Sequence, residues 1–268
     1  TNNTLSFDGQ DMSSIVCKRA TKLHTEECEQ TDNTYYCSGA GFAGKTITYG
    51  TVPGKELKSG DAFDCDVNGD GTYDENTERF YYVTDMNDST AVLIYYNNVS
   101  KGKPSNSTTY AYDSSGENWH GPRTAIEELP STSEWRNVSL TSSVRNIVTE
   151  NGTKTTTGGT LPDSFSYAGK AARLLTIQEV RKATGISNIP TWQVGELDNF
   201  NYLFENTKYS NGSNAAWSWW LENPRSSYSD YAWIVYGNHR SVNLSTVSGA
   251  GDDGVRPAIE VLKSNIEY

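Results

Sequence analysis

The chain has 268 residues, a formal charge of −11, a mean hydropathy of −0.65 and only 35% hydrophobic residues, yet its 7 Trp and 17 Tyr supply large rings for a folded core. No apolar run approaches the roughly 18 residues that a membrane-spanning helix needs. The pI near 4.8 disfavours a sequence-independent nucleic-acid binder, which requires a basic face.

Residues 1–60 are polar and punctuated by glycine, and the first quarter of the chain holds Cys17, Cys28, Cys37 and Cys65. The closely spaced cysteine pairs of zinc sites are absent, so we expect two disulfides and leave the three possible pairings open. Disulfides indicate an oxidising, extracellular or cell-surface setting, whereas four free thiols in a cytosolic protein are the alternative. We expect a disulfide-stapled, β-rich segment over 1–60, with a short strand at 45–49 and no helix. A separate domain should follow over 61–268.

Closely spaced oxygen ligands follow the last cysteine. Calcium takes six to eight hard oxygens, and alternating Asp and Asn residues around a glycine turn can surround it. The twelve-position pattern of a calcium loop fits this segment in two registers. One register begins at Asp64 and places Glu75 at the twelfth position. The other begins at Asp66, resembles the calcium loops of dockerins and places Thr77 at the twelfth position, with Glu78 one residue later. We favour the second register, because its Asp-Gly turn has ligands on both sides. It predicts a structural calcium ion held by Asp66, Asn68, Asp70, Thr72, Asp74 and Glu78. The alternative is a bare polar hairpin tip.

The next segments predict a hairpin and then long loops. Residues 79–83 and 91–96 are rich in β-branched and aromatic residues, and the polar residues 84–90 join them. Residues 101–170 are mostly Ser, Thr, Asn and Gly, which is typical of surface loops held by a few anchors. The expected anchors are Trp119, Trp135 and Val138. One or two helical turns are expected at 124–129, before Pro130.

The last hundred residues return to regular structure. Thr176 and Glu179 have the spacing of a capping box, so a helix should begin there, run to Ala183 and end at Gly185. Short strands are expected at 202–204, 216–221, 231–236, 242–244 and 255–262. The fold class is therefore α+β, with short twisted antiparallel strands, about two helices and long loops.

Four motifs in this region carry a resemblance. They are Ala-Arg-Leu-Leu-Thr-x-x-Glu at 172–179, Trp-Trp-Leu-x-x-Pro at 219–224, Tyr-Ala-Trp-Ile-Val-Tyr-Gly at 231–237 and Gly-Val-Arg-Pro-Ala at 254–258. In this order they resemble a bacterial domain family of uncharacterised function with a C-type-lectin-like fold, over about 61–268. The same fold occurs in the variable proteins of diversity-generating retroelements, which implies a rigid scaffold that displays C-terminal side chains to a ligand.

The resemblance also has limits. The sugar-binding motifs Glu-Pro-Asn and Trp-Asn-Asp of animal lectins are absent, so calcium-dependent sugar binding of that kind is not expected. No cysteine follows Cys65, which disfavours the activity of the formylglycine-generating enzymes that share the fold. Residues 223–248 are rich in Asn, Ser, Tyr, Asp and His, the types that adenine-directed mutagenesis of Asn codons produces.

The C-terminal segment also has the composition of a binding surface. Tyr and Trp give large contact areas at low entropy cost, and Ser and Asn give adaptable hydrogen bonds. The candidate ligand-binding residues are Trp217, Asn223, Arg225, Tyr228, Asp230, Tyr231, Tyr236, Asn238, His239, Arg240 and Asn243. An ordinary solvated surface is the alternative for these residues. Trp219, Trp220, Trp233 and Val235 are expected in the core, and Arg256 is expected to make structural hydrogen bonds.

No motif indicates catalysis. His24, His120 and His239 are far apart, and no nucleophile elbow, phosphate-binding glycine loop or His-Glu-x-x-His pattern occurs, so we do not expect an enzyme. We expect an extracellular or surface-displayed protein that binds a protein or glycan on another cell surface. The alternative is a structural, pilin-like or cell-wall subunit. Because the chain begins at Thr1, we expect a processed fragment, whose missing N-terminus could support a polymer or homo-oligomer.

Overall fold

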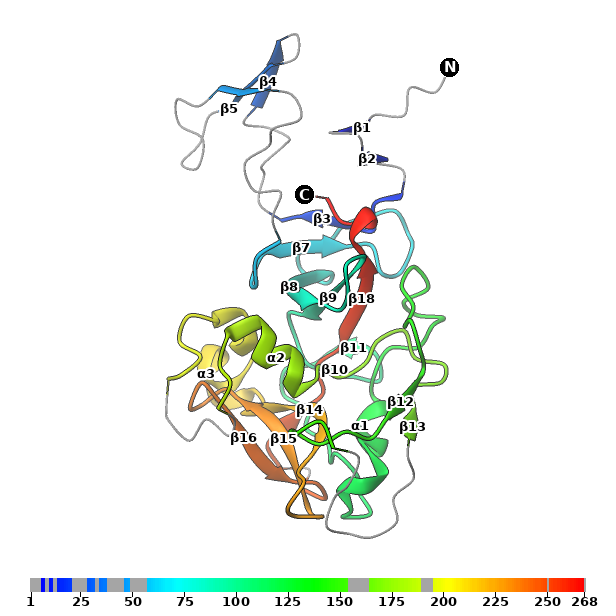
Figure 1. The fold of residues 1–268 in the computed structure, drawn as a ribbon, viewed down its shortest axis with the longest axis vertical. Coiled ribbons are helices and arrows are strands. Elements are labelled where there is room, and N and C mark those ends of the chain that lie inside the picture. The colour runs from blue at the N-terminus through cyan, green and yellow to red at the C-terminus, as the bar shows by residue number, and fades with distance from the viewer. Residues whose placement is uncertain are drawn as a thin grey trace.

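The computed structural model describes residues 14–20, 57–153, 164–188, 195–249 and 251–267, together with the backbone of five short strands near the N-terminus. Throughout these residues the protein is a mixed α+β structure in which strands predominate (Figure 1). Most strand pairs are antiparallel, and the helices are short. The α+β class expected from the sequence is confirmed at this level.

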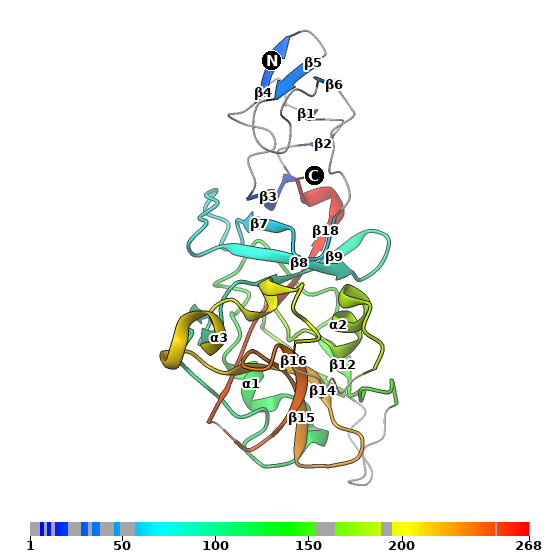
Figure 2. The ribbon, with the colours of Figure 1, turned by 90° about the vertical axis from the view of Figure 1, so that its left-hand side faces the viewer.

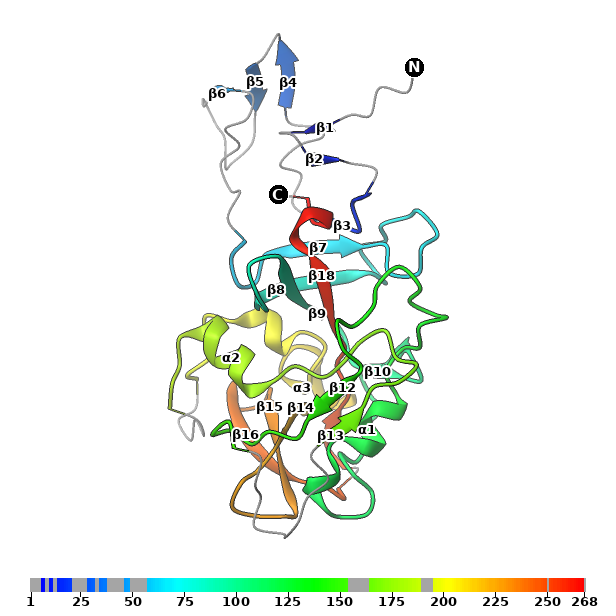
Figure 3. The ribbon, with the colours of Figure 1, turned by 45° about the vertical axis from the view of Figure 1, so that its right-hand side comes forward.

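A five-stranded antiparallel sheet has the order β18-β9-β8-β7-β3. Its strands are β3 Cys17–Arg19, β7 Ala62–Cys65, β8 Arg79–Asp85, β9 Thr90–Tyr95 and β18 Ala258–Leu262. The predicted hairpin is confirmed, because β8 and β9 pair directly across a short connection. The C-terminal end of the chain lies beside β3, where Ile266 forms a bridge to Cys17 (Figure 3).

A four-stranded sheet, in the order β16-β15-β14-β17, carries the C-terminal motifs. Its strands are β14 Ser218–Pro224, β15 Tyr231–Tyr236, β16 Ser241–Thr246 and β17 Asp253–Gly254. The first three form an antiparallel meander, and β17 runs parallel to β14. Strand β15 has the predicted bounds. Strand β14 begins and ends later than the predicted 216–221, and β16 extends beyond the predicted 242–244 at both ends.

The remaining strands form small sheets and hairpins. They are β1 Ser6–Phe7 with β2 Gln10–Asp11, β4 Cys28–Thr31 with β5 Thr34–Cys37 and β6 Thr46–Thr48, β10 Val99–Ser100 with β11 Lys103–Pro104, and β12 Val144–Asn146 with β13 Ser164–Ser166. The strand expected at 45–49 is therefore present as β6.

The helices are short. They are α1 Arg123–Glu127, α2 Ile177–Thr184 and α3 Lys208–Asn211, with 3-10 turns η2 Asn118–His120, η3 Asn201–Phe204, η4 Gly212–Asn214 and η5 Lys263–Asn265. The helical turns expected before Pro130 correspond to α1.

Helix α2 has both predicted ends. The Thr176 side chain accepts the Glu179 N–H at 3.1 Å, the Glu179 carboxylate accepts the Thr176 N–H at 2.8 Å, and Gly185 adopts the left-handed conformation with φ 72°. The helix contacts both β8 and β14, so it packs between the two sheets (Figure 2).

Two apolar clusters lie on opposite faces of these sheets, because successive side chains of a strand point to opposite sides. In β8, Phe80 faces the cluster that contains Trp135, whereas Tyr81 faces the cluster that contains α2. Strand β14 divides in the same way, with Trp220 in the first cluster and Trp219 in the second. Strands β8 and β14 are therefore buried on both sides.

The predicted core residues Trp219, Trp220, Trp233 and Val235 are all 0% exposed, so this prediction is confirmed. Of the three expected loop anchors, Trp135 and Val138 are buried and Trp119 is half-buried. Arg256 is fully buried and donates hydrogen bonds to the side chain of Asn98 and the carbonyls of Leu203 and Glu205, in agreement with a structural role.

Two predicted strands differ from the structure. Residues 202–204 lie in the 3-10 turn η3, where the Leu203 N–H donates to the Phe200 carbonyl at 3.0 Å, because a run of three apolar residues can equally be a buried turn. The strand expected at 255–262 begins only at Ala258, after Pro257, which lacks an N–H for the ladder.

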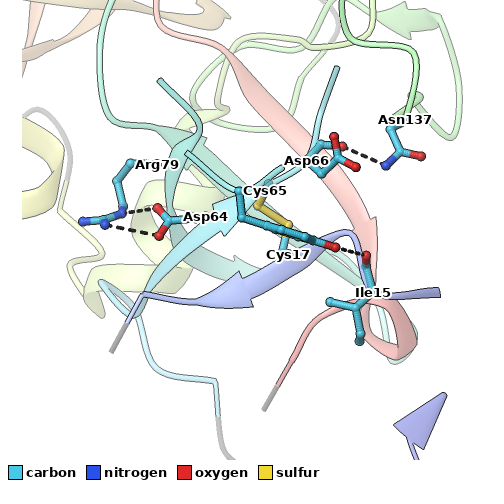
Figure 4. The surroundings of a disulfide bond; sticks show 8 residues. Ile15, Cys17, Asp64, Cys65, Asp66, Arg79 and Asn137 are labelled. Atoms are coloured by element: carbon cyan, nitrogen blue, oxygen red, sulfur yellow. Dashed lines mark hydrogen bonds and ion pairs between the residues drawn. A yellow bond between two sulfur atoms is a disulfide. The ribbon is translucent and has the colours of Figure 1, made fainter. Parts of the chain in front are cut away.

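One disulfide joins Cys17 in β3 to Cys65 in β7, and these residues lie opposite each other in the sheet (Figure 4). The expectation of disulfides is thus confirmed for one bond. Cys28 and Cys37 lie opposite each other in the register of β4 and β5, and a second bond stays a prediction. The division at residue 60 also stays a prediction. No helix among the described residues is long and apolar enough to cross a membrane.

Candidate functional site

The predicted ligand-binding residues do not form one face. Tyr231 begins β15 and Tyr236 ends it, so the two rings are separated by the length of the strand, about 17 Å at 3.3 Å per residue. Trp217, Tyr236, Asn238, His239 and Arg240 lie at one end of β15. Arg225, Tyr228, Asp230 and Tyr231 lie at the other.

The first end forms a cluster that we call the aromatic-basic patch, consisting of Lys208, Tyr209, Trp217, Tyr236, His239 and Arg240. Its aromatic rings are in contact: Trp217 and Tyr236 are stacked with centroids 6.4 Å apart, and His239 lies 4.8 Å from Tyr236. The Lys208 ammonium lies 3.4 Å above the Trp217 ring, a cation–π arrangement. The patch therefore joins three segments of the chain: α3, the residue before β14 and the β15–β16 turn.

Arg240 closes the patch on its other side. Its guanidinium lies 4.5 Å from the Tyr209 ring and makes an ion pair with Asp198 at 3.1 Å. Its backbone φ of 48° is uncommon outside glycine and costs about 1–3 kcal/mol, which these side-chain contacts must offset. A pocket of about 390 Å³ opens next to Arg240, lined by Asn201, Phe204, Glu205, Tyr209, Ser210 and Arg240.

Gly237 explains why the turn fits so closely against α3. A Cβ atom at this position would lie 2.7 Å from the Thr207 hydroxyl and 2.7 Å from the Trp217 carbonyl, so only glycine fits without movement. The Gly237 N–H donates to the same carbonyl at 2.8 Å. The turn thus holds Asn238 and His239 out to solvent while it fixes Trp217 behind them.

At the other end of β15, Tyr228 and Tyr231 form an edge-to-face pair with centroids 6.0 Å apart, and Tyr228 is 57% exposed. The buried Asn118 holds this loop, because its side-chain amide donates to the backbone carbonyls of Arg225, Tyr228 and Tyr231 at 2.7–2.9 Å. We call Tyr228, Asp230 and Tyr231 the tyrosine tip.

Three of the predicted ligand-binding residues lie outside the aromatic-basic patch and the tyrosine tip. Asn223 is 3% exposed and accepts the Ile177 N–H at 2.7 Å, so it supports the start of α2 and is removed from the binding surface. Arg225 makes an ion pair with the buried Glu150 at 3.4 Å and lies over the Trp233 ring. Asn243 is half-buried in the edge strand β16 and belongs to neither the aromatic-basic patch nor the tyrosine tip.

Two side chains distinguish the two registers of the predicted metal loop, Asp64 and Glu75. Asp64 lies in β7, outside the loop, and accepts hydrogen bonds from Arg79 at 2.6 and 3.3 Å (Figure 4). The Glu75 side chain is 73% exposed. Neither side chain is therefore placed as the register that begins at Asp64 requires, and calcium binding itself stays a prediction.

In the register that begins at Asp66, Asp66 itself accepts the N–H groups of Asp70 and Gly71 at 2.9 and 3.1 Å. Asn68 accepts the same Asp70 N–H at 2.8 Å, and Asp70 accepts both the N–H and the hydroxyl of Thr72. The loop is thus held by hydrogen bonds from its own backbone N–H groups to its acidic and amide side chains.

Glu78 closes the loop from the side of the core. It is 3% exposed, and burial, together with the nearby carboxylates of Asp70, Asp66 and Asp74, raises the pKa of its carboxyl to about 7. Among the described residues, no group of three or more His, Cys, Asp or Glu side chains is arranged as a ready metal centre.

A possible catalytic arrangement around His120 does not have the geometry of a triad. His120 Nδ1 lies 2.6 Å from the buried Asp113 carboxylate and 3.0 Å from the Ser115 hydroxyl. A nucleophile and an orienting acid must contact different nitrogens of the base, whereas here both meet the same one. His24 lies outside the described residues, and His239 belongs to the patch.

The chain matches one family model, a domain of unknown function, DUF6273, over residues 133–263. No curated protein and no solved structure matches it. The matched region contains the aromatic-basic patch and the tyrosine tip, and excludes the loop at 66–78 and both cysteines of the disulfide.

Sequence reasoning missed Lys208, Tyr209 and Asn118. Lys208 and Tyr209 follow the segment mistaken for a strand, and their contacts with Trp217 and Arg240 arise only from the tertiary fold. Asn118 is one of many asparagines in a loop, and nothing local distinguishes it.

Proposed function

We propose that this chain is an extracellular or surface-displayed recognition protein with a C-type-lectin-like fold, and that the aromatic-basic patch contacts its ligand. One observation carries the proposal: aromatic and basic side chains from three separate segments converge on one end of a sheet that is buried on both faces. Trp and Tyr rings give much contact area for little lost entropy, and Lys and Arg add directional polar contacts.

The patch is well ordered before any ligand arrives. The Tyr236 and Trp217 rings support each other, and Arg240 is fixed by an ion pair and by the Tyr209 ring. Such preorganisation lowers the entropy cost of binding. At the same time, Tyr209 remains 50% exposed and His239 is exposed, so a partner can reach them.

The compartment and the fold resemblance support the same proposal. The Cys17–Cys65 disulfide is compatible with an oxidising setting outside the cytoplasm. The motif at 172–179 forms the start of α2, those at 219–224 and 231–237 form β14 and β15, and the motif at 254–258 leads into β18. The segments that carry the resemblance are therefore packed together, and we propose a protein or glycan on another cell surface as the ligand.

The test compares two double variants that each remove one exposed tyrosine. The patch variant is Tyr209→Ala with His239→Ala, and the matched control at the tyrosine tip is Tyr228→Ala with Asp230→Ala. Binding to a panel of immobilised glycans and to intact cells is measured for both and for the wild type. We expect at least tenfold weaker binding for the patch variant, about 1.4 kcal/mol, and unchanged binding for the control.

If the control loses binding and the patch variant keeps it, the ligand-binding surface is the tyrosine tip and the proposal is wrong about the site. If the wild type forms polymers and neither variant changes any binding, the pilin-like or cell-wall role is favoured instead. Circular dichroism and thermal unfolding of both variants establish that they are folded.

A further inference from the structure

Glu78 has one buried carboxylate oxygen that accepts no hydrogen bond from the described part of the protein. Its Oε2 accepts the Asp74 N–H at 3.0 Å, whereas Oε1 is buried without a hydrogen-bond partner among the described residues. The whole residue is 3% exposed. A buried polar atom without a partner is costly, so this oxygen calls for a donor or a cation.

The groups around this oxygen are themselves oxygen donors. Asp66 is 7% exposed, and Asp66, Asp70 and Asp74 each use carboxylate oxygens to accept backbone N–H groups within the loop. A carboxylate offers about four acceptor positions, so each keeps lone pairs for a further partner. Neighbouring carboxylates in one short loop repel one another, and a bound cation would relieve that repulsion.

We propose that the loop 66–78 binds one calcium ion, with Glu78 completing the ligand shell from the buried side. Calcium takes six to eight oxygens from carboxylates, amide side chains, backbone carbonyls and water. The loop offers the carboxylates together with the Asn68 side chain and, at the seventh position, the backbone carbonyl of Thr72. Because no three of these acidic side chains already form a metal centre, the ion would have to draw them together as it binds. The proposed shell contains no nitrogen or sulfur donor, which disfavours zinc.

The ion would act on the fold through contacts that the loop already makes. The Asp66 carbonyl accepts the Asn137 side-chain amide at 2.7 Å, and the Asp66 N–H donates to the Val16 carbonyl at 2.9 Å (Figure 4). The Tyr73 hydroxyl donates to the Ile15 carbonyl at 2.8 Å. A calcium ion that fixed this loop would therefore also fix the segment around Asn137 and the start of β3.

The experiment uses the full chain after treatment with a chelator and its removal, and calorimetric titration with calcium chloride. Glu78→Gln and Glu75→Gln are a matched pair, since both replace a glutamate carboxylate of the same loop by an amide and differ in whether the side chain is buried. We expect the wild type and Glu75→Gln to bind one equivalent with affinities within twofold of each other. Glu78→Gln should bind at least tenfold more weakly.

Thermal unfolding gives a second readout. The melting temperature of the wild type should rise with calcium concentration, because the ion binds the native state. Asp70→Asn provides an independent variant if Glu78→Gln fails to fold, since Asp70 is exposed and the asparagine can still accept the Thr72 N–H. It too should bind calcium at least tenfold more weakly than the wild type.

Three results would overturn the proposal. One is the absence of both heat and melting-temperature change up to about 10 mM calcium, beyond the range of extracellular calcium modules. Another is an equal loss of affinity in Glu75→Gln and Glu78→Gln, which would indicate general charge attraction. The third is equal binding of magnesium, which would show that the loop has no calcium shell.

Discussion

Breaking the Cys17–Cys65 disulfide should destabilise the protein by about 4 kcal/mol, because the bond closes a loop with a sequence separation of 48 and a cross-link of that length restricts the unfolded chain. Both sulfur atoms lie in fully buried residues, so the bond is also part of the core. Strand β3 has only three residues and lies at the edge of its sheet, which makes it the first element to lose order.

The clean measurement uses a Cys28→Ala, Cys37→Ala background, in which Cys17–Cys65 is the sole disulfide that can form. Urea unfolding of this protein is compared before and after reduction, so that only the covalent bond changes. Adding Cys17→Ala and Cys65→Ala should cost somewhat more than reduction, since removing two buried sulfur atoms also leaves a cavity. Hydrogen exchange should show lost protection first in residues 15–19 and in the β7 residues opposite them.

A loss below about 1 kcal/mol on reduction would refute the loop-closure reasoning, because the calculated effect is about fourfold larger. Lost protection that began in β14–β16, with β3 still protected, would refute the assignment of the effect to the edge strand.

Three further predictions concern buried groups. Arg173→Met should lower the free energy of urea unfolding by about 3–5 kcal/mol, because the buried Glu260 carboxylate would lose the guanidinium that donates to it at 2.7 Å. A loss under about 1 kcal/mol would contradict this reasoning. Gly254→Ala should cost about 1–3 kcal/mol, since its methyl group would lie 2.3 Å from Asn98 Nδ2, whereas Gly251→Ala, with open space around it, should be neutral. Burial raises the pKa of Asp253 to about 6, so the native state favours its protonated form, and between pH 4 and pH 8 the wild type should lose about 2–3 kcal/mol more stability than Asp253→Asn. Equal losses in the two proteins would show that the Asp253 carboxyl is not the cause.

Elements whose ends are fixed by nearby residues could be predicted from the sequence. Helix α2 needs only Thr176, Glu179 and Gly185, all within ten residues, and the structure shows each in its predicted role. Strand β15 is an unbroken run of β-branched and aromatic residues, and its predicted bounds are confirmed. In both cases the local pattern and the tertiary fold favour the same conformation.

The site was less predictable, because its contacts join distant parts of the chain. Asn223 precedes a proline and looks like a loop residue, yet it accepts a hydrogen bond from Ile177, 46 residues earlier. Arg240 contacts the Tyr209 ring although 31 positions separate the two residues in the sequence, and no local sequence pattern predicts that contact. The composition of 217–243 favours a surface of aromatic and polar side chains, but composition carries no information on which end of a strand each side chain occupies.

The residues of the β15–β16 turn differ in how closely they pack, and this difference bears on the proposed recognition role. Gly237 has no space for a side chain, whereas Asn238 and His239 next to it are exposed. A change at Gly237 would disturb Thr207 and the packing of the turn, while changes at Asn238 or His239 would leave both apolar clusters untouched. The turn therefore combines one position at which only glycine fits with two neighbouring positions whose exposed side chains the core does not use.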